Sequence, residues 1–105
     1  MNGAARKLSA ALCVHNEAAQ LADCLETLSF ADEIVVVLDR CSDESKAVAE
    51  KFGARTVEGA WPLEGPRRHA GIDMCTGDWI LEVDADERAS EALGREIRQT
   101  IEHAA

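Results

Sequence analysis

The hydrophobic residues of the chain gather in four short runs, and the stretches between them carry apolar residues at helical spacing. The run Glu33–Leu38 is unbroken and rich in β-branched residues, which is typical of a strand covered on both faces of a parallel sheet. Three further runs predict strands on the same grounds. They are Leu8–Val14, Ala54–Val57 and Asp78–Val83.

Four helices are predicted, one after each strand, from apolar positions such as Leu21, Leu25 and Leu28 that recur on one face. Polar residues mark helix starts because their side chains accept hydrogen bonds from the first turn, and glycine ends helices because it adopts left-handed dihedral angles. In chain order the helices begin after Asn16, after Ser42 or Asp43, near Pro66 and after Ser90, and Gly53 and Gly77 end the second and third.

The order of these elements is βαβαβαβα within 105 residues, which is room for one domain, residues 1–105. Glycines and a proline predict a loop over Glu58–Gly65. Parallel strands joined by right-handed helical crossovers place helices on both faces of a sheet. The sequence therefore predicts an α/β fold with a parallel, Rossmann-like sheet.

The charge of the chain limits its partners. Lys and Arg number 11 against 20 Asp and Glu, which gives a formal net charge of −9. An acidic protein repels phosphate, so binding to nucleic acid or to an anionic membrane surface is not expected. A phosphorylated ligand would need a positive group to hold it.

The N-terminus does not resemble a signal peptide, because the apolar run after the basic stretch Met1–Lys7 is short. No stretch approaches the roughly 18 apolar residues of a membrane span. We therefore expect the chain in the cytoplasm. The four cysteines form no C-x-x-C pair and are expected to be free thiols, and a metal site of Cys13, His15 and Cys41 is the alternative.

Polar residues cluster after three of the predicted strands. In an open α/β sheet, ligands bind beyond the carboxyl ends of the strands, where the strand order reverses. Each of these residues alone could be a solvated loop residue, but their joint placement predicts a site. They are His15, Asn16 and Glu17 after the first strand, Asp39 after the second, and Asp84 and Asp86 after the fourth.

The segment Asp78–Glu87 contains five acidic residues and no basic one. Carboxylates gathered at a strand end repel one another unless a cation neutralises them. With no His or Cys among them, oxygen ligands favour a hard ion, Mg²⁺ or Mn²⁺. Such an ion is usually completed by water and substrate phosphates, and it would supply the positive charge that a diphosphate needs here.

Arg67 and Arg68 form the one arginine pair, at the predicted start of the third helix. Guanidinium groups and a helix N-terminus both bind phosphate, so the pair is a candidate phosphate site. The alternative is a surface pair that balances neighbouring acids. We interpret His69 as a solvated or packing residue rather than a catalytic base.

Four segments of the chain resemble the family 2 glycosyltransferases, which use nucleotide sugars and have the GT-A fold. The first strand leading into His15-Asn16-Glu17 is similar to their opening strand and turn. Glu33–Asp39 followed by Cys41–Ser45 resembles a second motif. Arg68–Gly71 resembles their R-N-x-G stretch, and Gly77–Glu87 resembles G-D-W-I-L-x-x-D-A-D-E. The form of this last motif is most similar to enzymes of lipopolysaccharide-core and envelope-glycan assembly.

The resemblance implies a role for individual residues of this sequence. The departures are His69, where the family usually has Asn, and Arg40-Cys41, where small residues are more common. The implied binding residues are Asn16 and Glu17 facing the nucleotide, Asp39 at the base, Arg68 at the base or diphosphate, Asp84 near the ribose or sugar and as a second metal ligand, and Asp86 as the metal ligand.

The resemblance also implies a reaction. A sugar passes from a nucleoside diphosphate sugar to a glycan, a lipid-linked or a lipopolysaccharide-type acceptor, with inversion and with Mg²⁺ or Mn²⁺. Such acceptors would place the protein peripherally at the inner face of a membrane. In the family, the general base lies after the D-x-D region, so this chain is expected to be the nucleotide-binding half of a GT-A domain, with its catalytic base unassigned.

A half domain of this kind should expose a sheet edge and apolar surface. The second hypothesis is therefore a nucleotide-binding remnant without turnover, in which a second copy of the chain covers that surface. Two further families fit less well. A sugar-phosphate nucleotidyltransferase should show a glycine-rich loop after the first strand, and a phosphoacceptor receiver domain should carry a lysine on a later strand.

Overall fold

The computed structural model describes residues 7–104 and has the predicted order of strands and helices. Of the basic stretch Met1–Lys7, only Lys7 lies within the described residues. The strands are β1 (Leu8–Val14), β2 (Glu33–Asp39), β3 (Arg55–Gly59) and β4 (Trp79–Asp84). The helices are α1 (Ala18–Glu26), α2 (Ser45–Lys51), α3 (Glu64–Met74) and α4 (Glu91–Glu102).

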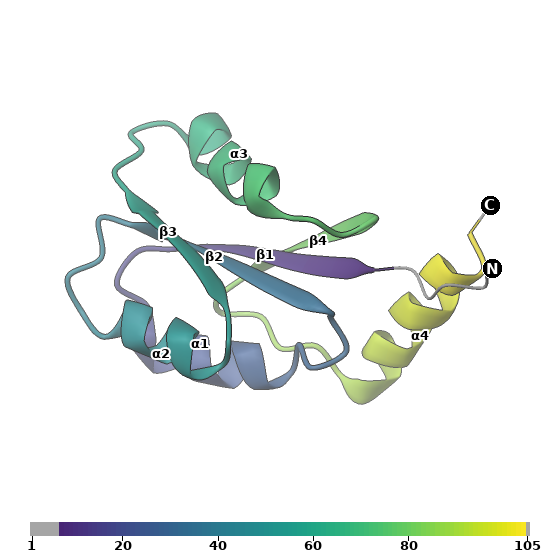
Figure 1. Ribbon diagram of the computed structural model, residues 1–105. Coiled ribbons are helices and arrows are strands. Elements are labelled where there is room, and N and C mark those ends of the chain that lie inside the picture. Colours follow the sequence, from purple (N-terminus) through teal and green to yellow (C-terminus); the bar gives the residue numbers. More distant parts are fainter. Residues whose placement is uncertain (1–6, 105) are drawn as a thin grey trace.

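The strands form one parallel sheet in the order β3-β2-β1-β4. The strand order reverses at β1, because β2 and β3 extend the sheet on one side of it and β4 lies on the other. Figure 1 shows α1 and α2 against one face and α3 against the opposite face. The predicted α/β sheet with helices on both faces is confirmed.

The two central strands form the core. Every residue of β2 from Val35 to Asp39 is buried, and β1 is buried except for Cys13. Leu21, Cys24 and Leu25 of α1 pack beneath them. The apolar sequence of these strands follows from this position, since both faces of the sheet are covered at β1 and β2.

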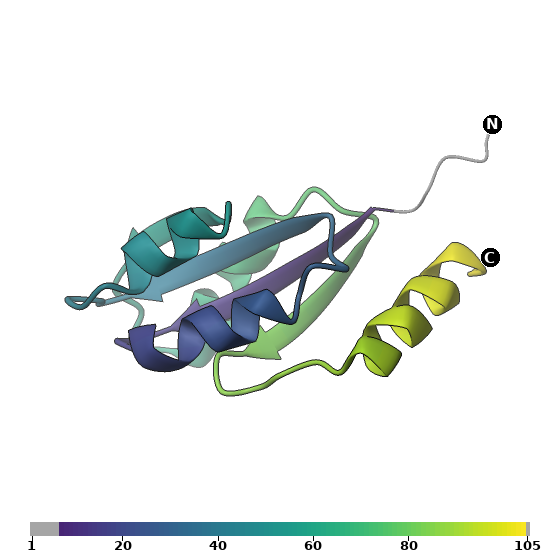
Figure 2. The same ribbon diagram turned by 90° about the horizontal axis from the view of Figure 1, so that it is seen from below.

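Strand β4 lies at the edge of the sheet and is much more exposed. Trp79 and Ile80 are exposed, and an apolar groove of about 300 Å³ runs between β4 and α4. Figure 2 shows α4 apart from the other helices, beyond β4. The structure thus has the exposed edge and apolar surface expected from the sequence. None of the helices within residues 7–104 is long and apolar enough to cross a membrane.

Two glycines are explained by their surroundings. Gly53 follows α2 with a φ of 77°, the left-handed conformation predicted there. Gly71, in the middle of α3, lies so close to the sheet that a Cβ atom would be 2.9 Å from Val37 Cγ2. The helix therefore packs directly onto β2 and β1 through a position without a side chain.

Gly77 does not end α3, as the sequence suggested, because the helix ends at Met74. A Cβ atom at Gly77 would lie 2.6 Å from Ser9 Oγ and 2.8 Å from the Ser9 nitrogen. The glycine is needed where the chain enters β4 alongside β1. Helix α3 also begins at Glu64, two residues before Pro66, and Gly59 ends β3 rather than lying in the loop.

Asn16 is not the N-cap of α1, which is Glu17. Asp43 acts at the starts of two helices: its Oδ2 accepts from the Ala18 nitrogen of α1 and its Oδ1 from the Ser45 nitrogen of α2. Neither Ser42 nor Asp43 is the N-cap residue of α2, which is Glu44. Of the predicted caps, Ser90 is confirmed, because its Oγ accepts from the Leu93 nitrogen.

Candidate functional site

The carboxyl ends of β1, β2 and β4 meet at one edge of the sheet, where the sequence predicted a site. Cys13 pairs in register with Asp84, and Val14 pairs with Leu38, the residue before Asp39. Helix α3 crosses from β3 to β4 over this end and brings Arg67 and Arg68 to it. The reversal of strand order at β1 therefore coincides with the cluster of charged side chains.

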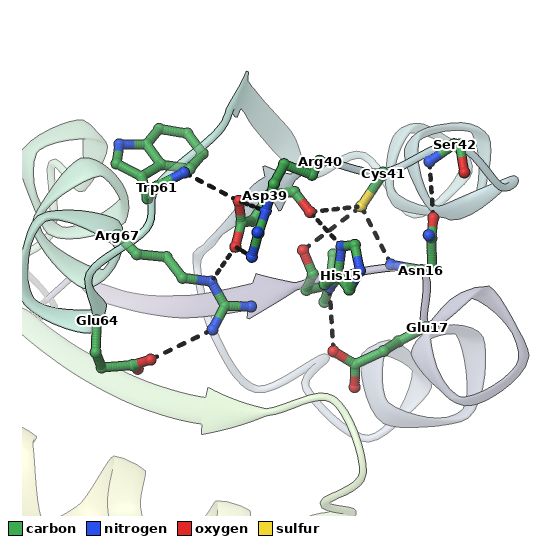
Figure 3. Close-up of polar contacts among 11 residues, drawn as sticks. His15, Asn16, Glu17, Asp39, Arg40, Cys41, Ser42, Trp61, Glu64 and Arg67 are labelled. Atoms are coloured by element: carbon green, nitrogen blue, oxygen red, sulfur yellow. Dashed lines mark hydrogen bonds and ion pairs between the residues drawn. The ribbon is translucent and has the colours of Figure 1, made fainter.

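Asp39 is the most enclosed residue of this cluster, with 1% of its surface exposed. Arg40 donates to both carboxylate oxygens, from Nε to Oδ1 at 3.0 Å and from an Nη to Oδ2 at 3.1 Å. The backbone nitrogen of Trp61 also donates to Oδ1, at 3.1 Å. Figure 3 shows these groups and Arg67 converging on the carboxylate.

Arg67 reaches Asp39 from α3, and its Nε lies 3.1 Å from Oδ2. This contact is an ion pair without hydrogen-bond geometry, so the buried Nε makes no hydrogen bond within the described residues. The Arg40 hydrogen bonds lower the pKa of Asp39, and the Trp61 nitrogen and the charge of Arg67 add to this against the effect of burial. Asp39 is therefore a charged group held in a dry position.

The turn after β1 is tied to the loop after β2. Asn16 has a φ of 51°, which asparagine tolerates better than most residues. Its Oδ1 accepts from the backbone nitrogens of Ser42 and Asp43 at 2.7 and 3.1 Å. The role of Asn16 visible in the structure is thus to hold two loops together.

His15 and Glu17 complete this turn. The His15 Nδ1 lies 2.8 Å from the Asp39 carbonyl oxygen and donates to it, which sets the imidazole orientation. Glu17 Oε1 accepts from the His15 backbone nitrogen at 3.1 Å, so the carboxylate folds back onto the turn. Figure 3 shows the Glu17 side chain beside His15 and away from Asp39.

Arg68 pairs with Glu82 of β4 through two hydrogen bonds, and its Nε donates to Oε1 at 2.9 Å. The pair lines a pocket of about 340 Å³ between α3 and the ends of β1 and β4. The charged groups that line it are Arg67, Arg68, Glu64, Glu82, Asp84 and Glu87. Two arginines against four carboxylates leave the pocket negative, so a diphosphate would enter it only with a cation.

Asp84 and Asp86 differ from Asp39 in being exposed. The Asp84 backbone is fixed, because its nitrogen donates to Glu87 Oε1 and its carbonyl accepts from Glu87 and Cys24. Within residues 7–104, neither carboxylate has an ion pair or a side-chain hydrogen bond. The two predicted metal residues are thus available ligands on a held turn.

A divalent ion fits these carboxylates only in part. Nowhere in the described part of the chain do three His, Cys, Asp or Glu side chains gather as a metal site. Cys13, His15 and Cys41 therefore do not form a group of metal ligands. The four cysteines are free thiols, as expected. One or two carboxylates suit Mg²⁺ or Mn²⁺, which take their remaining ligands from water and phosphates. The donor set therefore fits an ion bound together with a diphosphate.

A larger hollow than this pocket lies elsewhere. It measures about 680 Å³ and runs between the end of α1 and α4, where Arg95 and Arg98 line it. It contains none of the strand-end residues that the sequence singled out. We take the smaller pocket as the candidate site, because it lies where the strand order reverses and gathers charged groups from α3 and β4.

Several residues of the site were missed by sequence reasoning. Trp61, in the predicted loop, supplies a donor to Asp39, and Glu82 was noted only as one acid among five. Arg67 was noted as one of two adjacent arginines, but its ion pair with Asp39 was not predicted. Both arginines pair with carboxylates, as the alternative interpretation expected, but only Arg68 lies at the surface, because Arg67 is mostly enclosed. His69 is exposed and lies 3.7 Å from Asp73, away from the pocket, as a solvated residue should.

Comparison with protein families gives a match over residues 9–103 to the family described as "Glycosyl transferase family 2". An uncharacterized glycosyltransferase of Rickettsia felis is 35% identical over 92 residues, which cover 87% of this chain and 32% of that protein. The lipopolysaccharide core biosynthesis glycosyltransferase LpsC of Rhizobium meliloti is 33% identical over 82% of this chain and 34% of its own length. The chain spans about a third of the length of these relatives.

Solved structures with the same fold include glucosyl-3-phosphoglycerate synthase from Mycobacterium tuberculosis in complex with Mn²⁺, UDP and glucosyl-3-phosphoglycerate. It has a TM-score of 0.69 at 21% identity and covers 79% of this chain and 36% of its own. A mannosyltransferase from Pyrobaculum calidifontis in complex with GDP-Man and Mn²⁺ has a TM-score of 0.75 at 17% identity, over 91% of this chain and 32% of its own. At these identities the likeness is one of fold.

Proposed function

Because this chain belongs to glycosyl transferase family 2, we propose that it is the donor-binding part of a metal-dependent glycosyltransferase. The donor is a nucleoside diphosphate sugar. The sugar passes to a glycan or lipopolysaccharide-type acceptor with inversion at the anomeric carbon. The activity belongs to the whole protein, of which the described residues form the donor site.

The observation that carries this proposal is the pocket between α3 and the ends of β1 and β4. It brings two arginines and the Asp84 carboxylate to the place where an α/β sheet binds ligands. Its negative balance matches a ligand that enters as a complex of a diphosphate with a divalent cation. A neutral metabolite would need neither the arginines nor the exposed carboxylates.

We assign the residues as follows. Asp39 accepts a hydrogen bond from the nucleoside, because it is the one strand-end carboxylate held in a dry position. Arg68, on the wall of the pocket, binds the diphosphate after it leaves Glu82. Asp84 lies by the ribose or sugar and beside the cation, and Asp86 ligates the cation. Asn16 and Glu17 shape the turn that faces the nucleotide.

The cation is Mg²⁺ or Mn²⁺, and the fold neighbours crystallised with Mn²⁺ and a nucleotide support this choice. When bound, it stabilises the negative charge that grows on the departing nucleoside diphosphate. The residues of this chain bind and orient the donor. We assign no general base among residues 7–104.

The name of LpsC supports an acceptor in lipopolysaccharide-core assembly. We propose that the protein works in the cytoplasm, at the inner face of the membrane where a lipid-linked acceptor would be presented.

Calorimetric titration of UDP and then other nucleoside diphosphates tests the donor site, with Mn²⁺ and with chelator, on wild type and Asp86→Ala. We expect binding that requires Mn²⁺ and that is lost in the variant. Asp73→Ala is the matched control, because Asp73 is an exposed aspartate of α3 away from the pocket. A folded wild-type chain that binds no nucleoside diphosphate would contradict the proposal.

A nucleotide-binding remnant without turnover is the second candidate. The exposed β4 edge and the apolar groove beside α4 favour it, because a second copy of the chain could bury them. Sedimentation would then give a dimer, and donor-sugar hydrolysis or transfer would be undetectable beside metal-dependent nucleotide binding. A monomer with measurable turnover excludes it.

A further inference from the structure

The carboxylate of Asp39 has no free position for a ligand in this structure. Each oxygen has two positive or donating neighbours. Oδ1 accepts from Arg40 and from the Trp61 backbone nitrogen. Oδ2 accepts from Arg40 and lies against the Arg67 Nε. A nucleoside that donates a hydrogen bond to Asp39 must therefore displace one of these groups.

The three neighbours of Asp39 are not equally easy to displace. The Trp61 nitrogen belongs to the main chain and cannot leave without moving the loop. The Arg67 side chain is 19% exposed and is enclosed between α3 and the sheet. The Arg40 side chain is 56% exposed, and within residues 7–104 its guanidinium has no other partner than Asp39. Arg40 is therefore the group that can move into solvent at the lowest cost.

The main chain at Arg40 is unusual as well. Arg40 has a φ of 51°, a left-handed conformation that costs energy for a residue with a side chain. Its backbone nitrogen donates to the Gly59 carbonyl at 2.8 Å, so the position is fixed between β2 and β3. The chain thus keeps an arginine at a position that suits glycine, directly beside the carboxylate that it covers.

We propose that Arg40 sets the affinity of the donor site by closing Asp39 when the site is empty and leaving it when a nucleoside takes its place. This inference rests on the function proposed above and adds a residue that competes with the ligand. Arg67 and the Trp61 nitrogen stay on the carboxylate in both states. The nucleoside replaces the two Arg40 hydrogen bonds.

The size of the effect follows from the population of the closed arrangement. A ligand that binds only the open form has an apparent Kd equal to the intrinsic Kd divided by the open fraction. The Arg40 side chain is 56% exposed, so solvent screens its half of the contact with the buried Asp39; the contact is therefore weak and the open fraction substantial. Removing the guanidinium should therefore lower the Kd for a nucleoside diphosphate about two- to fivefold.

The binding test compares Arg40→Ala and Arg40→Gly with wild type, using calorimetric titration of UDP with Mn²⁺ at saturating metal. Arg40→Gly also relieves the left-handed conformation, so it gives a folded protein if the alanine variant does not fold. Arg95→Ala is the control, because it removes an equal charge from an exposed residue of α4 that lines a different hollow from the candidate site. We expect tighter binding in both Arg40 variants and no change in the control.

A second measurement examines the contact without any nucleotide. In the wild-type protein alone, the Arg40 Nε–H should exchange with water about two- to fivefold more slowly than that of an exposed arginine, because the proton is bonded to Asp39 in the closed arrangement. Saturation with UDP and Mn²⁺ should bring its exchange to the rate of an exposed arginine such as Arg95. This readout tests the closed contact independently of affinity.

The possible results distinguish a failure of the role of Arg40 from a failure of the proposed function. Unchanged or weaker UDP binding in both Arg40 variants, with wild type binding normally, overturns the role of Arg40 and leaves the donor site intact. Equal exchange rates at Arg40 Nε and at Arg95 Nε in the nucleotide-free protein also overturn it. If neither wild type nor the variants bind any nucleoside diphosphate, the proposed function fails and the role of Arg40 fails with it.

Discussion

Two strand ends of this sheet carry aspartates with opposite surroundings. At the end of β2, Asp39 is buried and bound by two arginines and a backbone nitrogen. At the end of β4, Asp84 and Asp86 are exposed, and no cation of residues 7–104 pairs with them. The carboxylate is therefore part of the folded framework at the end of β2, whereas at the end of β4 it is exposed and open to a ligand.

The difference comes from the position of each strand in the sheet. Strand β2 has a strand on each side and helices over both faces, so its end is surrounded by the β3–α3 loop and by α3 itself. Strand β4 has a strand on one side only. A carboxylate at an enclosed strand end needs fixed hydrogen-bond donors, whereas water solvates a carboxylate at the edge of the sheet until a ligand binds.

The largest effect on stability should come from Asp39→Ala. It leaves the mostly buried Arg67 guanidinium with only the exposed Glu64, 3.5 Å away, as a counterion, which should lower the free energy of unfolding by about 3 kcal/mol. Urea unfolding measures this. Asp39→Asn keeps the shape of the side chain and should cost less. A loss below about 1 kcal/mol for the alanine variant would remove the distinction between the two strand ends.

Ligand binding at the end of β4 should raise the free energy of unfolding of the protein. UDP with Mn²⁺ at about 100 times its Kd should stabilise the wild-type protein by about 2.7 kcal/mol, because the ligand binds only the folded state. The same addition should leave the stability of Asp86→Ala unchanged. Thermal unfolding with and without chelator measures both, and an equal rise in the variant would place the cation elsewhere.

Glu33 sharpens the comparison, since it is a carboxylate at the opposite end of β2. Burial raises its pKa, but hydrogen bonds from the Thr76 nitrogen, from Ser9 and Thr76 hydroxyls and from Arg55 outweigh this and lower it to about 2. The carboxylate form therefore stabilises the folded state above pH 4.5, and this stability is lost as the pH falls from 4.5 to about 2.

Glu33→Gln should accordingly lower the free energy of unfolding at pH 7 by about 2 kcal/mol and make it less dependent on pH between 4.5 and 2. Urea unfolding at a series of pH values gives the slope. If the free energy of unfolding of Glu33→Gln depended on pH as steeply as that of the wild type, the hydrogen-bond donors around Glu33 would not stabilise its carboxylate form.

The smallest effect is expected for Asp84→Asn and Asp86→Asn in the absence of ligand. Neither side chain makes a contact that the fold depends on, so each free energy of unfolding should stay within about 0.5 kcal/mol of wild type. Urea unfolding under the conditions used for Asp39→Asn makes the two ends directly comparable. A large loss would show that these carboxylates are structural as well.

The sequence predicted the strands well because their signal is local. The uninterrupted apolar runs of β1 and β2 require no knowledge of the rest of the chain, and both strands begin at the predicted residue. The start of α1 was wrong because its first backbone nitrogen is capped by Asp43, which lies 25 residues further along. Gly77 was misread for a similar reason, since its constraint is Ser9.

The place of the candidate site follows from topology, but its internal contacts do not. Strand ends of a parallel sheet share one edge, so the grouping of Asp39 with Asp84 needed only the element order. The pairing of Arg67 with Asp39, and of Arg68 with Glu82, depends on how α3 crosses the sheet. Which arginine meets which carboxylate is decided by the rotation of that helix, which the pattern of α3 does not reveal.

Gly71 sets the distance between helix α3 and the sheet, and with it the depth of the pocket. Helix α3 carries Arg67 and Arg68 as a rigid unit, and it rests on Val37 at Gly71, a position without a side chain. The height of the helix above the sheet therefore determines the depth at which both guanidinium groups stand. Any larger residue at position 71 would lift the helix or displace Val37, and would withdraw both arginines together from the carboxylates that they bind. Gly71 thus determines the positions of both arginines without being part of the pocket wall itself.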